Sequence, residues 1–295
     1  MKNNQLKEKR ELGSLYAYPM GIWFTLFFLL PFTIIIIYSF LRKALYGGVE
    51  LHFTLIAYKQ IFQKAYGLIL TRTLLISLEA TVITLLIAIP CALALARSKY
   101  QTFFLSVIII PFLINSLLKI FALMSIFSSD GIINRMLLGM GVIDNSISFL
   151  YNRNAVILLM VYMYLPYAIF PIFASIDSFD FTLLDAARDL GYNKFQSYIH
   201  VLLPEIKEGI TTAFLFTFIP AFGAYTIPLF VGGKDSYMIG NLIVDQINKT
   251  RNWPLSAAFS VLLTIISTAL VLYFFVDEKK NKNHHSRKGG NHGIY

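Results

Sequence analysis

Six long apolar stretches constrain the fold of this 295-residue chain more than any other feature. A helix needs about 20 mostly apolar residues to cross the hydrocarbon core of a membrane. The stretches that reach this length are residues 17–41, 70–96, 102–127, 155–176, 210–231 and 255–276. The first stretch is too long for the apolar region of a signal peptide, and no small-residue cleavage site follows it. The sequence therefore predicts an all-α, polytopic membrane protein with six transmembrane helices, which form one domain over residues 17–276.

The composition agrees with a membrane protein and excludes several other classes. Hydrophobic residues make up 57% of the chain and charged residues only 14%, whereas a soluble domain carries about 25% charged residues. The net charge of +9 does not indicate nucleic-acid binding, because the basic residues lie at the termini and between apolar stretches. The single cysteine, Cys91, excludes an internal disulfide and a multi-cysteine metal site.

The distribution of basic residues also predicts an orientation. If the N-terminus lies inside, the inner segments hold fourteen lysines and arginines and the outer segments hold nine. Positive residues favour the cytoplasmic side of a membrane. We therefore expect cytoplasmic segments at residues 1–16, 177–209 and 277–295, and both termini in the cytoplasm.

The C-terminal segment 277–295 is polar and basic, and it contains His284, His285 and His292. Three histidines could bind a metal ion. The composition instead favours a disordered tail beside anionic lipid, without a metal site.

The polar loop between the fourth and fifth stretches carries the most specific pattern in the chain. Residues 185–204 read DAARDLGYNKFQSYIHVLLP. This segment resembles the EAA loop of type I, binding-protein-dependent ABC importer permeases, whose pattern is E-A-A, three residues, G, nine residues and I-x-L-P. The matching residues are Asp185, Ala186, Ala187, Gly191, Val201, Leu203 and Pro204. Aspartate replaces the glutamate of the pattern, and valine replaces its isoleucine.

The resemblance implies a fold, a function and a set of partners. The fold would be that of a type I importer permease in the bacterial inner membrane. The partners would be a dimer of ATP-binding subunits, a second homologous permease subunit and an extracytoplasmic solute-binding protein. The family couples transport to the ATPase through this loop, so ATP and Mg would be used by the partner. This chain would bind no cofactor and would have no catalytic residue.

The chain itself offers no alternative site for ATP. Gly232-Gly233-Lys234-Asp235 is similar to part of a phosphate-binding loop. That loop needs an earlier glycine, where Pro228 stands, and a serine or threonine after the lysine, where Asp235 stands. Motifs of a metalloprotease or a serine hydrolase are also missing, so a membrane enzyme is a weak rival. A passive channel is a second rival, but a channel has no use for an ATPase-docking loop.

The loop has the capping residues of two short helices. Thr182 and Asp185 fit a capping box at the start of a helix over residues 183–190. Gly191 stands where a helix end favours the left-handed conformation. Asn193 is expected to cap a second helix, with Gln196 as its reciprocal partner. The loop is therefore predicted to form a helix, a glycine elbow and a second helix.

The first of these helices is amphipathic. Its apolar residues are Leu183, Leu184, Ala187 and Leu190. The small Ala186 and Ala187 would let another surface approach closely. Its residues alone fit an amphipathic hairpin on the inner leaflet equally well. The resemblance instead implies a helix that docks in a groove of the ATP-binding subunit.

Further motifs over residues 70–276 resemble the spermidine/putrescine group of these permeases. They include Ile110-Pro111-Phe112 and Asp130-Gly131-Ile132-Ile133-Asn134 in and after the third stretch, and Asn252-Trp253-Pro254 before the sixth. The resemblance implies spermidine or putrescine as the solute. Permeases for other small solutes, such as opines or ferric iron, share some of these motifs and form the alternative.

A pathway for a polycation is expected to offer aromatic faces and a few carboxylates, without a fixed positive group. The candidate residues are Glu79, Tyr162, Tyr164, Tyr167 and Tyr225. Aromatic residues at such positions more often serve in packing or as interfacial anchors, so the preference for a cation rests mainly on the resemblance.

The prolines and glycines of two neighbouring stretches indicate where helices could break. Pro166 and Pro171 are expected to interrupt the fourth stretch, and Pro220, Gly223 and Pro228 the fifth. A proline removes a helical hydrogen bond, and such backbone is tolerated in a membrane where protein or water satisfies it. We interpret the two interrupted stretches as a moving gate, with a simple packing kink as the alternative.

Glu79 and Lys119 lie at similar predicted depths in the second and third stretches, about 12–14 Å from the outer face at 1.5 Å per residue. Because an unpaired charge in a membrane is costly, we expect them to face each other or a water-filled cavity. The alternative is that Lys119 extends outward and Glu79 is protonated.

Overall fold

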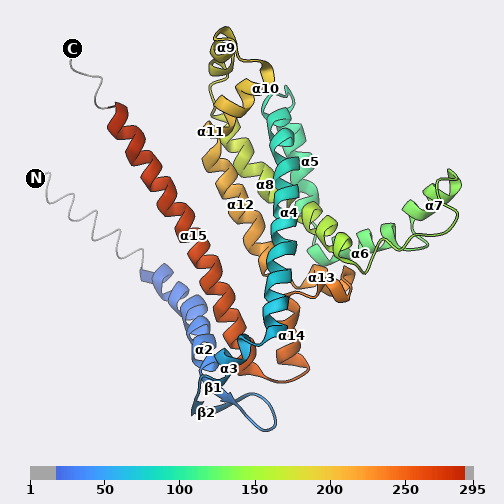
Figure 1. Ribbon diagram of the computed structural model, residues 1–295, viewed down its shortest axis with the longest axis vertical. Coiled ribbons are helices and arrows are strands. Elements are labelled where there is room, and N and C mark those ends of the chain that lie inside the picture. The colour runs from blue at the N-terminus through green and yellow to red at the C-terminus, as the bar shows by residue number, and fades with distance from the viewer. Residues whose placement is uncertain (1–17, 290–295) are drawn as a thin grey trace, which may run out of the picture. The chain divides into compact units, whose positions relative to one another are not determined.

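The computed structural model describes residues 18–289 (Figure 1). These residues form two compact units. One unit combines the chain up to Tyr66 with Leu242–Ile265, and the other combines Gly67–Asn241 with the chain from Ile266 onward.

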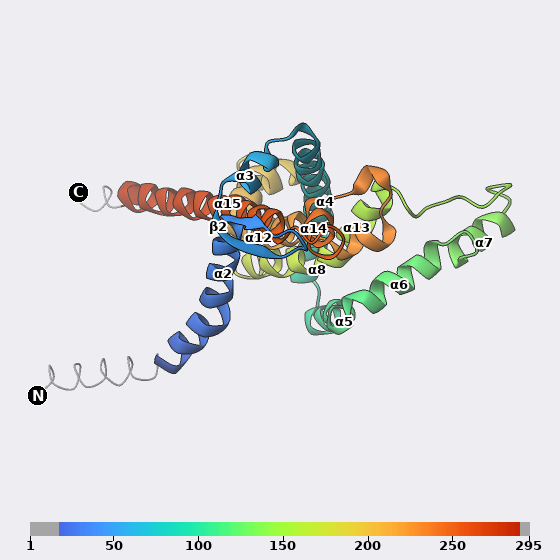
Figure 2. The same cartoon turned by 90° about the horizontal axis from the view of Figure 1, so that it is seen from below.

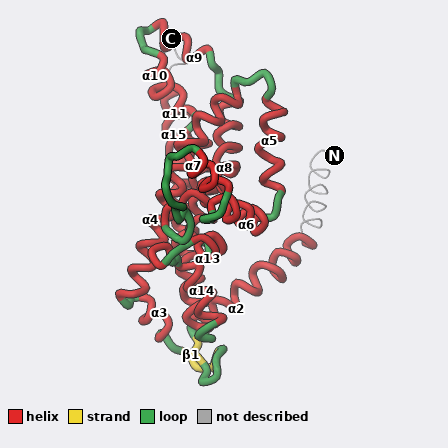
Figure 3. The backbone as a smooth tube through the Cα atoms, turned by 90° about the vertical axis from the view of Figure 1, so that its right-hand side faces the viewer, coloured by secondary structure: helices red, strands yellow, loops and turns green. Residues whose placement is uncertain are grey.

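Apart from one small hairpin, the regular secondary structure of residues 18–289 consists of helices joined by loops (Figure 3), which confirms the predicted all-α class. The helical stretches that are long and apolar enough to cross a membrane are Tyr18–Ser39, Lys64–Ala96, Ser116–Gly139, Arg153–Asp177 and Trp253–Val276. A shorter apolar helix covers Gln101–Leu113.

The first unit contains the first apolar helix, which includes the π-helical turn η1 (Thr25–Leu29) and α2 (Leu30–Ser39). It is followed by β1 (Leu41–Lys43), β2 (Val49–Phe53) and α3 (Ile56–Ile61). The two strands pair antiparallel. This unit also holds the start of α15, whose full range is Trp253–Gly289.

The hairpin turn depends on two glycines. Gly47 and Gly48 have φ angles of 97° and 84°, a region that L-residues with side chains rarely adopt. The Gly48 N–H donates a hydrogen bond of 3.1 Å to the carbonyl of Arg251. The turn is thereby tied to the segment that precedes α15.

The second unit holds most of α4 and every element up to the start of α14. Its elements are α4 (Lys64–Ala96), α5 (Gln101–Leu113), α6 (Ser116–Phe127), α7 (Ile132–Gly139), α8 (Arg153–Asp177), α9 (Thr182–Asp189), α10 (Lys194–Ser197), the π-helical η2 (Tyr198–Leu202), α11 (Leu203–Glu205), α12 (Lys207–Phe222), α13 (Thr226–Val231), the 3-10 turn η3 (Lys234–Ser236) and α14 (Ile239–Asn248). Within this unit α7 lies at the far end of an arm that begins with α6 (Figure 2).

The most extensive packing between two helices of this unit is that of α8 with α12. Gly209 makes the approach possible, because a Cβ at this position would lie 2.8 Å from the carbonyl oxygen of Pro171 and would overlap the side chain of Ser175. An apolar cluster links α8 to α4 through residues such as Ala92 and Ile172.

The third and fifth apolar stretches each consist of two helices. The third was predicted as a continuous span, which is wrong, whereas the fifth is interrupted at Gly223 as predicted, although Pro220 and Pro228 lie inside α12 and α13. In the third, Ile114 is extended and ends α5, and the Asn115 side chain accepts a hydrogen bond of 2.8 Å from the Leu117 N–H to cap α6. In the fifth, α12 ends before Gly223, and α13 begins at Thr226. An asparagine that can cap a helix and a glycine that favours a helix end explain these two breaks.

The fourth stretch, which was expected to be interrupted, is a continuous helix. Pro166 and Pro171 lie inside α8, which continues through both of them. A proline removes one hydrogen bond, and the helical turns on either side can still pack on neighbours. Here α12 packs beside Pro171 through Gly209.

The segment for which a disordered tail was predicted also differs. The helix α15 continues to Gly289, so residues 277–289 extend the last apolar helix. Adding a residue to an existing helix is far easier than starting a new one. His284 and His285 lie on this extension, and His292 lies outside the described residues.

Candidate functional site

The start of α9 is capped by a residue that the sequence analysis did not select. The Asp180 carboxylate accepts hydrogen bonds from the Thr182 N–H at 3.0 Å and the Thr182 hydroxyl at 2.8 Å. Thr182 is therefore the first residue of α9 and a donor to the cap, so the predicted Thr182–Asp185 capping box is wrong. The two hydrogen bonds, of which that from the hydroxyl counts most, hold the pKa of Asp180 below its usual value.

The elbow after α9 has the predicted conformation. Gly191 has a φ of 96°. Its N–H donates to the Arg188 carbonyl at 2.9 Å, and the Tyr192 N–H donates to the Ala187 carbonyl at 3.1 Å. These two bonds form a Schellman motif, which closes a helix with a glycine in the left-handed region.

The second helix of the loop, α10, begins with the predicted capping box. The Asn193 side chain accepts from the Gln196 N–H at 2.8 Å, and the Gln196 side chain accepts from the Asn193 N–H at 3.0 Å. The helix then widens into the π-helical η2 before Pro204. Pro204 has no N–H to donate to the preceding turn, which explains the widening and places it in the first turn of α11.

The apolar residues of α9 divide between two faces. Leu184 and Ala187 are buried in the core of this chain, together with Leu202 of η2. Leu183 and Leu190 are exposed, by 47% and 86%. The predicted apolar residues of α9 thus lie on two faces of the helix. One face packs against the core of this chain, and the other, which we call the open face, is exposed.

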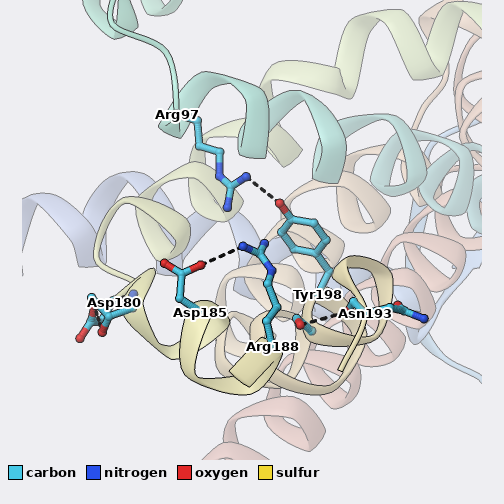
Figure 4. Close-up of polar contacts among 8 residues, drawn as sticks. Arg97, Asp180, Asp185, Arg188, Asn193 and Tyr198 are labelled. Atoms are coloured by element: carbon cyan, nitrogen blue, oxygen red, sulfur yellow. Dashed lines mark hydrogen bonds and ion pairs between the residues drawn. The ribbon is translucent and has the colours of Figure 1, made fainter. Parts of the chain in front are cut away.

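The open face also carries Ala186 and the acidic start of the EAA-like pattern. Ala186 and Asp185 are exposed, and the Asp185 carboxylate forms an ion pair of 2.8 Å with Arg188 one turn on (Figure 4). Of the two alanines, Ala186 is therefore the one that another protein could contact. Val201 and Leu203 are partly buried against the chain's own core.

A cavity of about 290 Å³ lies where the third and fifth apolar stretches break. It is lined by Phe112, Ile114, Ser116, Lys119, Ile120, Met163, Tyr164, Tyr167, Ala224, Tyr225, Thr226 and Ile227. The breaks supply Ile114 and Ala224, and the middle of α8 supplies the tyrosine pair. Tyr164 and Tyr167 contact each other edge to face, with ring centroids 6.2 Å apart.

The cavity brings together three of the five candidate pathway residues. Tyr164, Tyr167 and Tyr225 line it, whereas Tyr162 and Glu79 are not among its lining residues. Their role in transport stays a prediction.

Of the two arrangements expected for Glu79 and Lys119, the ion pair between them is wrong, whereas Lys119 does face a cavity. Glu79 pairs with Arg153 at the start of α8, and Lys119 lines the cavity. Depth along two predicted helices could not reveal this partner, because Arg153 lies in a connection of the sequence and reaches Glu79 only when α8 packs on α4. The cavity also has a positive group and no carboxylate, contrary to the expectation for a polycation pathway.

A multi-span helical protein with an exposed helix–glycine–helix loop of this spacing is a permease subunit of an ABC importer. The chain belongs to the family of inner membrane components of binding-protein-dependent transport systems, which matches residues 80–282. It is thus a multi-pass protein of the inner membrane and a transport subunit rather than an enzyme.

Similar proteins of this family are polyamine permeases. The spermidine/putrescine transport system permease protein PotB of Escherichia coli (strain K12) is 36% identical over 255 residues, which cover 86% of this chain and 93% of that protein. PotB of Haemophilus influenzae is 33% identical over 86% of this chain and 89% of that protein.

Solved structures confirm the fold. A chain of a bacterial alginate ABC transporter in complex with an alginate-bound periplasmic protein matches with a TM-score of 0.73 at 18% identity, over 98% of this chain and 99% of that chain. This likeness shows the type I importer permease fold.

Proposed function

We propose that this permease subunit imports spermidine or putrescine, driven by ATP that a partner hydrolyses. The observation that carries the proposal is the identity of 36% with spermidine/putrescine permeases over 86% of this chain. The cavity supports it with the rings of Phe112, Tyr164, Tyr167 and Tyr225, because aromatic faces attract ammonium groups.

The proposed assembly contains four kinds of subunit. A dimer of ATP-binding subunits would contact the open face of α9, formed by Leu183, Ala186 and Leu190. A second, homologous permease subunit would complete the pathway. An extracytoplasmic solute-binding protein would deliver the solute. A solved importer of the same fold is in complex with a periplasmic protein, which supports the last of these partners.

The test is uptake by vesicles that contain the whole complex. With ATP inside and the solute-binding protein outside, we expect uptake of labelled spermidine or putrescine. The control vesicles lack either ATP or the binding protein, and they should take up none. Efficient uptake of an opine with polyamines ignored would contradict the proposal.

The presence of Lys119 in the cavity favours a second class of solute, one that carries a carboxylate. A lysine in a cavity without a carboxylate lining favours a solute that itself carries a carboxylate, such as an opine, over a polycation. The substitution Lys119→Gln separates the two solutes. It should maintain or raise polyamine uptake, because a repulsive charge is lost, whereas it should lower the uptake of a carboxylate solute.

The proposed orientation places the α9–α10 loop and both termini in the cytoplasm. Its test needs a background in which the exposed Cys91 is replaced by serine. Single cysteines at the exposed positions Asn145 and Asn248 should then react with an impermeant thiol reagent outside intact cells. A cysteine at the exposed Lys194 should react only after the cells are opened. Labelling at Lys194 from outside would overturn the orientation.

A further inference from the structure

Arg97 follows directly after α4 and contacts two aromatic rings of the α9–α10 loop, those of Phe181 and Tyr198. Figure 4 shows the contact with Tyr198. The Arg97 Nη1 donates a hydrogen bond of 2.6 Å to the hydroxyl of Tyr198. Its guanidinium carbon lies 4.9 Å from the centroid of the Phe181 ring and 5.4 Å from that of the Tyr198 ring. Both distances are within the range of a cation–π contact.

The two aromatic residues lie before and after the glycine elbow along the sequence. Phe181 is the residue before α9, and Tyr198 is the first residue of η2. Gly191 lies between the helix that follows Phe181 and the helical segment that contains Tyr198. One guanidinium group therefore joins the end of α4 to the entrance and to the return of the loop.

Apolar contacts also link α4 to the loop. Leu95 of α4, Leu184 of α9 and Leu202 of η2 are buried in one cluster. Apolar burial is non-directional, so such a contact holds the loop against α4 but permits rotation and sliding. A planar guanidinium that stacks on rings and donates a directed hydrogen bond fixes an orientation.

We propose that Arg97 is a positioning residue that makes the docking loop and α4 move as one body. The ATP-binding subunit would move the loop, and Arg97 would convert this movement into movement of α4. This inference rests on the proposed docking function of α9. It concerns transmission within this chain, because Arg97 is not part of the open face formed by Leu183, Ala186 and Leu190.

The first experiment measures ATP hydrolysis and solute uptake in the same vesicles with the whole complex. Arg97→Gln should leave ATP hydrolysis within about twofold of the unmodified complex and should lower uptake at least tenfold. The number of ATP molecules hydrolysed per solute therefore rises. Arg97→Lys keeps the charge but loses the planar group, and it should restore uptake only in part. Tyr198→Phe, which removes only the hydrogen bond, should give an intermediate loss.

Two matched controls distinguish this role from a loss of charge or of a hydroxyl. Lys99→Gln removes a positive charge two residues along the chain, where the structure gives the exposed lysine no ion pair among the described residues. Tyr192→Phe removes a hydroxyl from the same loop, where the ring stacks on His200 and the hydroxyl has no hydrogen bond among the described residues. Both variants should transport normally.

A second measurement does not depend on the solute. Spin labels on cysteines at the exposed positions Lys99 and Lys194, with Cys91 replaced, report the distance between the end of α4 and α10. The distribution of distances should broaden in Arg97→Gln and keep its width in Tyr192→Phe. An unchanged distribution would overturn the proposal. So would a parallel loss of hydrolysis and uptake in Arg97→Gln, because that result assigns Arg97 only a structural role.

Failure of the proposed function gives a different result. In that case the unmodified complex takes up no polyamine or binds no ATP-binding subunit, and the spin-label distances still test Arg97.

Discussion

Glu79, in the middle of α4, forms an ion pair with Arg153, the first residue of α8. The Arg153 N–H also donates a hydrogen bond of 3.1 Å to the Asp235 carboxylate. Arg153 thus connects the start of α8 to both α4 and η3, and Glu79 supplies the counter-charge for its side chain.

This relationship predicts coupled effects of substitution at the two positions. Each single substitution leaves the other charge without its partner, which is costly for Glu79 in a helix that is long and apolar enough to cross a membrane. Glu79→Gln and Arg153→Gln should each lower the thermal stability in detergent, and the double variant should lose less than the sum. The control is Glu79→Gln with Lys119→Gln, whose effects should add. Additive losses for Glu79 and Arg153 would contradict the pair.

The close approach of α12 to α8 depends on Gly209. A side chain here would overlap Ser175 and the Pro171 carbonyl, and overpacking of this kind costs about 1–3 kcal/mol. Gly209→Val should therefore lower the free energy of unfolding by this amount, measured by thermal unfolding in detergent. Gly67, where a Cβ would meet no atom within 4 Å, provides the control, and Gly67→Ala should not destabilise the protein. Equal stability of Gly209→Val and the unmodified chain would contradict the assigned packing.

The cap of α9 predicts a pH dependence. The hydrogen bonds from Thr182 lower the pKa of folded Asp180, so folding favours the ionised form. The stabilisation is complete above the pKa of an unfolded aspartate, about 3.9, and is lost as the pH falls through the lower pKa of the folded state. The protection of the Thr182 and Leu183 amides from hydrogen exchange, expressed relative to the intrinsic exchange rate at each pH, should therefore decrease on acidification in this range. Asp180→Asn should weaken that dependence, whereas an unchanged acid response in this variant would exclude Asp180 as its source.

Local patterns in the loop were sufficient to predict most of its backbone. Gly191 and the Asn193–Gln196 box act through neighbours within a few residues, so their roles could be read from spacing alone. The cap at Asp180 was missed because aspartate can cap from two residues away, in an Asx-type turn. Whether Thr182 or Asp180 caps the start of α9 depends on the path by which the chain leaves α8.

Long-range features were harder to predict for a physical reason. Hydropathy gives the length of an apolar stretch but not the point where it breaks, so the break at Ile114 was not distinguished from a continuous span. The break at Gly223 was predicted, because glycine favours a helix end. The cavity exists because these two breaks meet the middle of α8. The division of α9 into a buried and an open face likewise depends on where Leu184 packs. The partner of Glu79 was missed for the same reason.

The elbow predicts a ranking of substitutions at Gly191. A Cβ here would meet no atom within 4 Å, so the cost of a side chain comes from the positive φ rather than from a clash. Asparagine tolerates this region and β-branched residues resist it strongly. Gly191→Asn should retain most ATP-driven uptake, Gly191→Ala less, and Gly191→Val the least, with all three variants inserted in normal amount. Equal activity of the asparagine and valine variants would show that the elbow does not determine coupling.

The two alanines of the EAA-like pattern predict different defects. Ala187 is buried in this chain's own core, with 6% of its surface exposed, whereas Ala186 lies on the open face beside Leu183 and Leu190. Ala187→Glu would bury a charge beside Leu184, so it should destabilise the loop and lower the amount of protein in the membrane. Ala186→Glu should leave the amount and the thermal stability unchanged, because its side chain projects from the folded loop. It should nevertheless reduce co-purification of the ATP-binding subunit at least tenfold and abolish uptake, because charge and bulk then occupy a close apolar contact. Asp185→Glu, which restores the residue of the family pattern, is the control and should remain active. If Ala186→Glu binds the ATP-binding subunit and transports normally, the open face of α9 is not the docking surface.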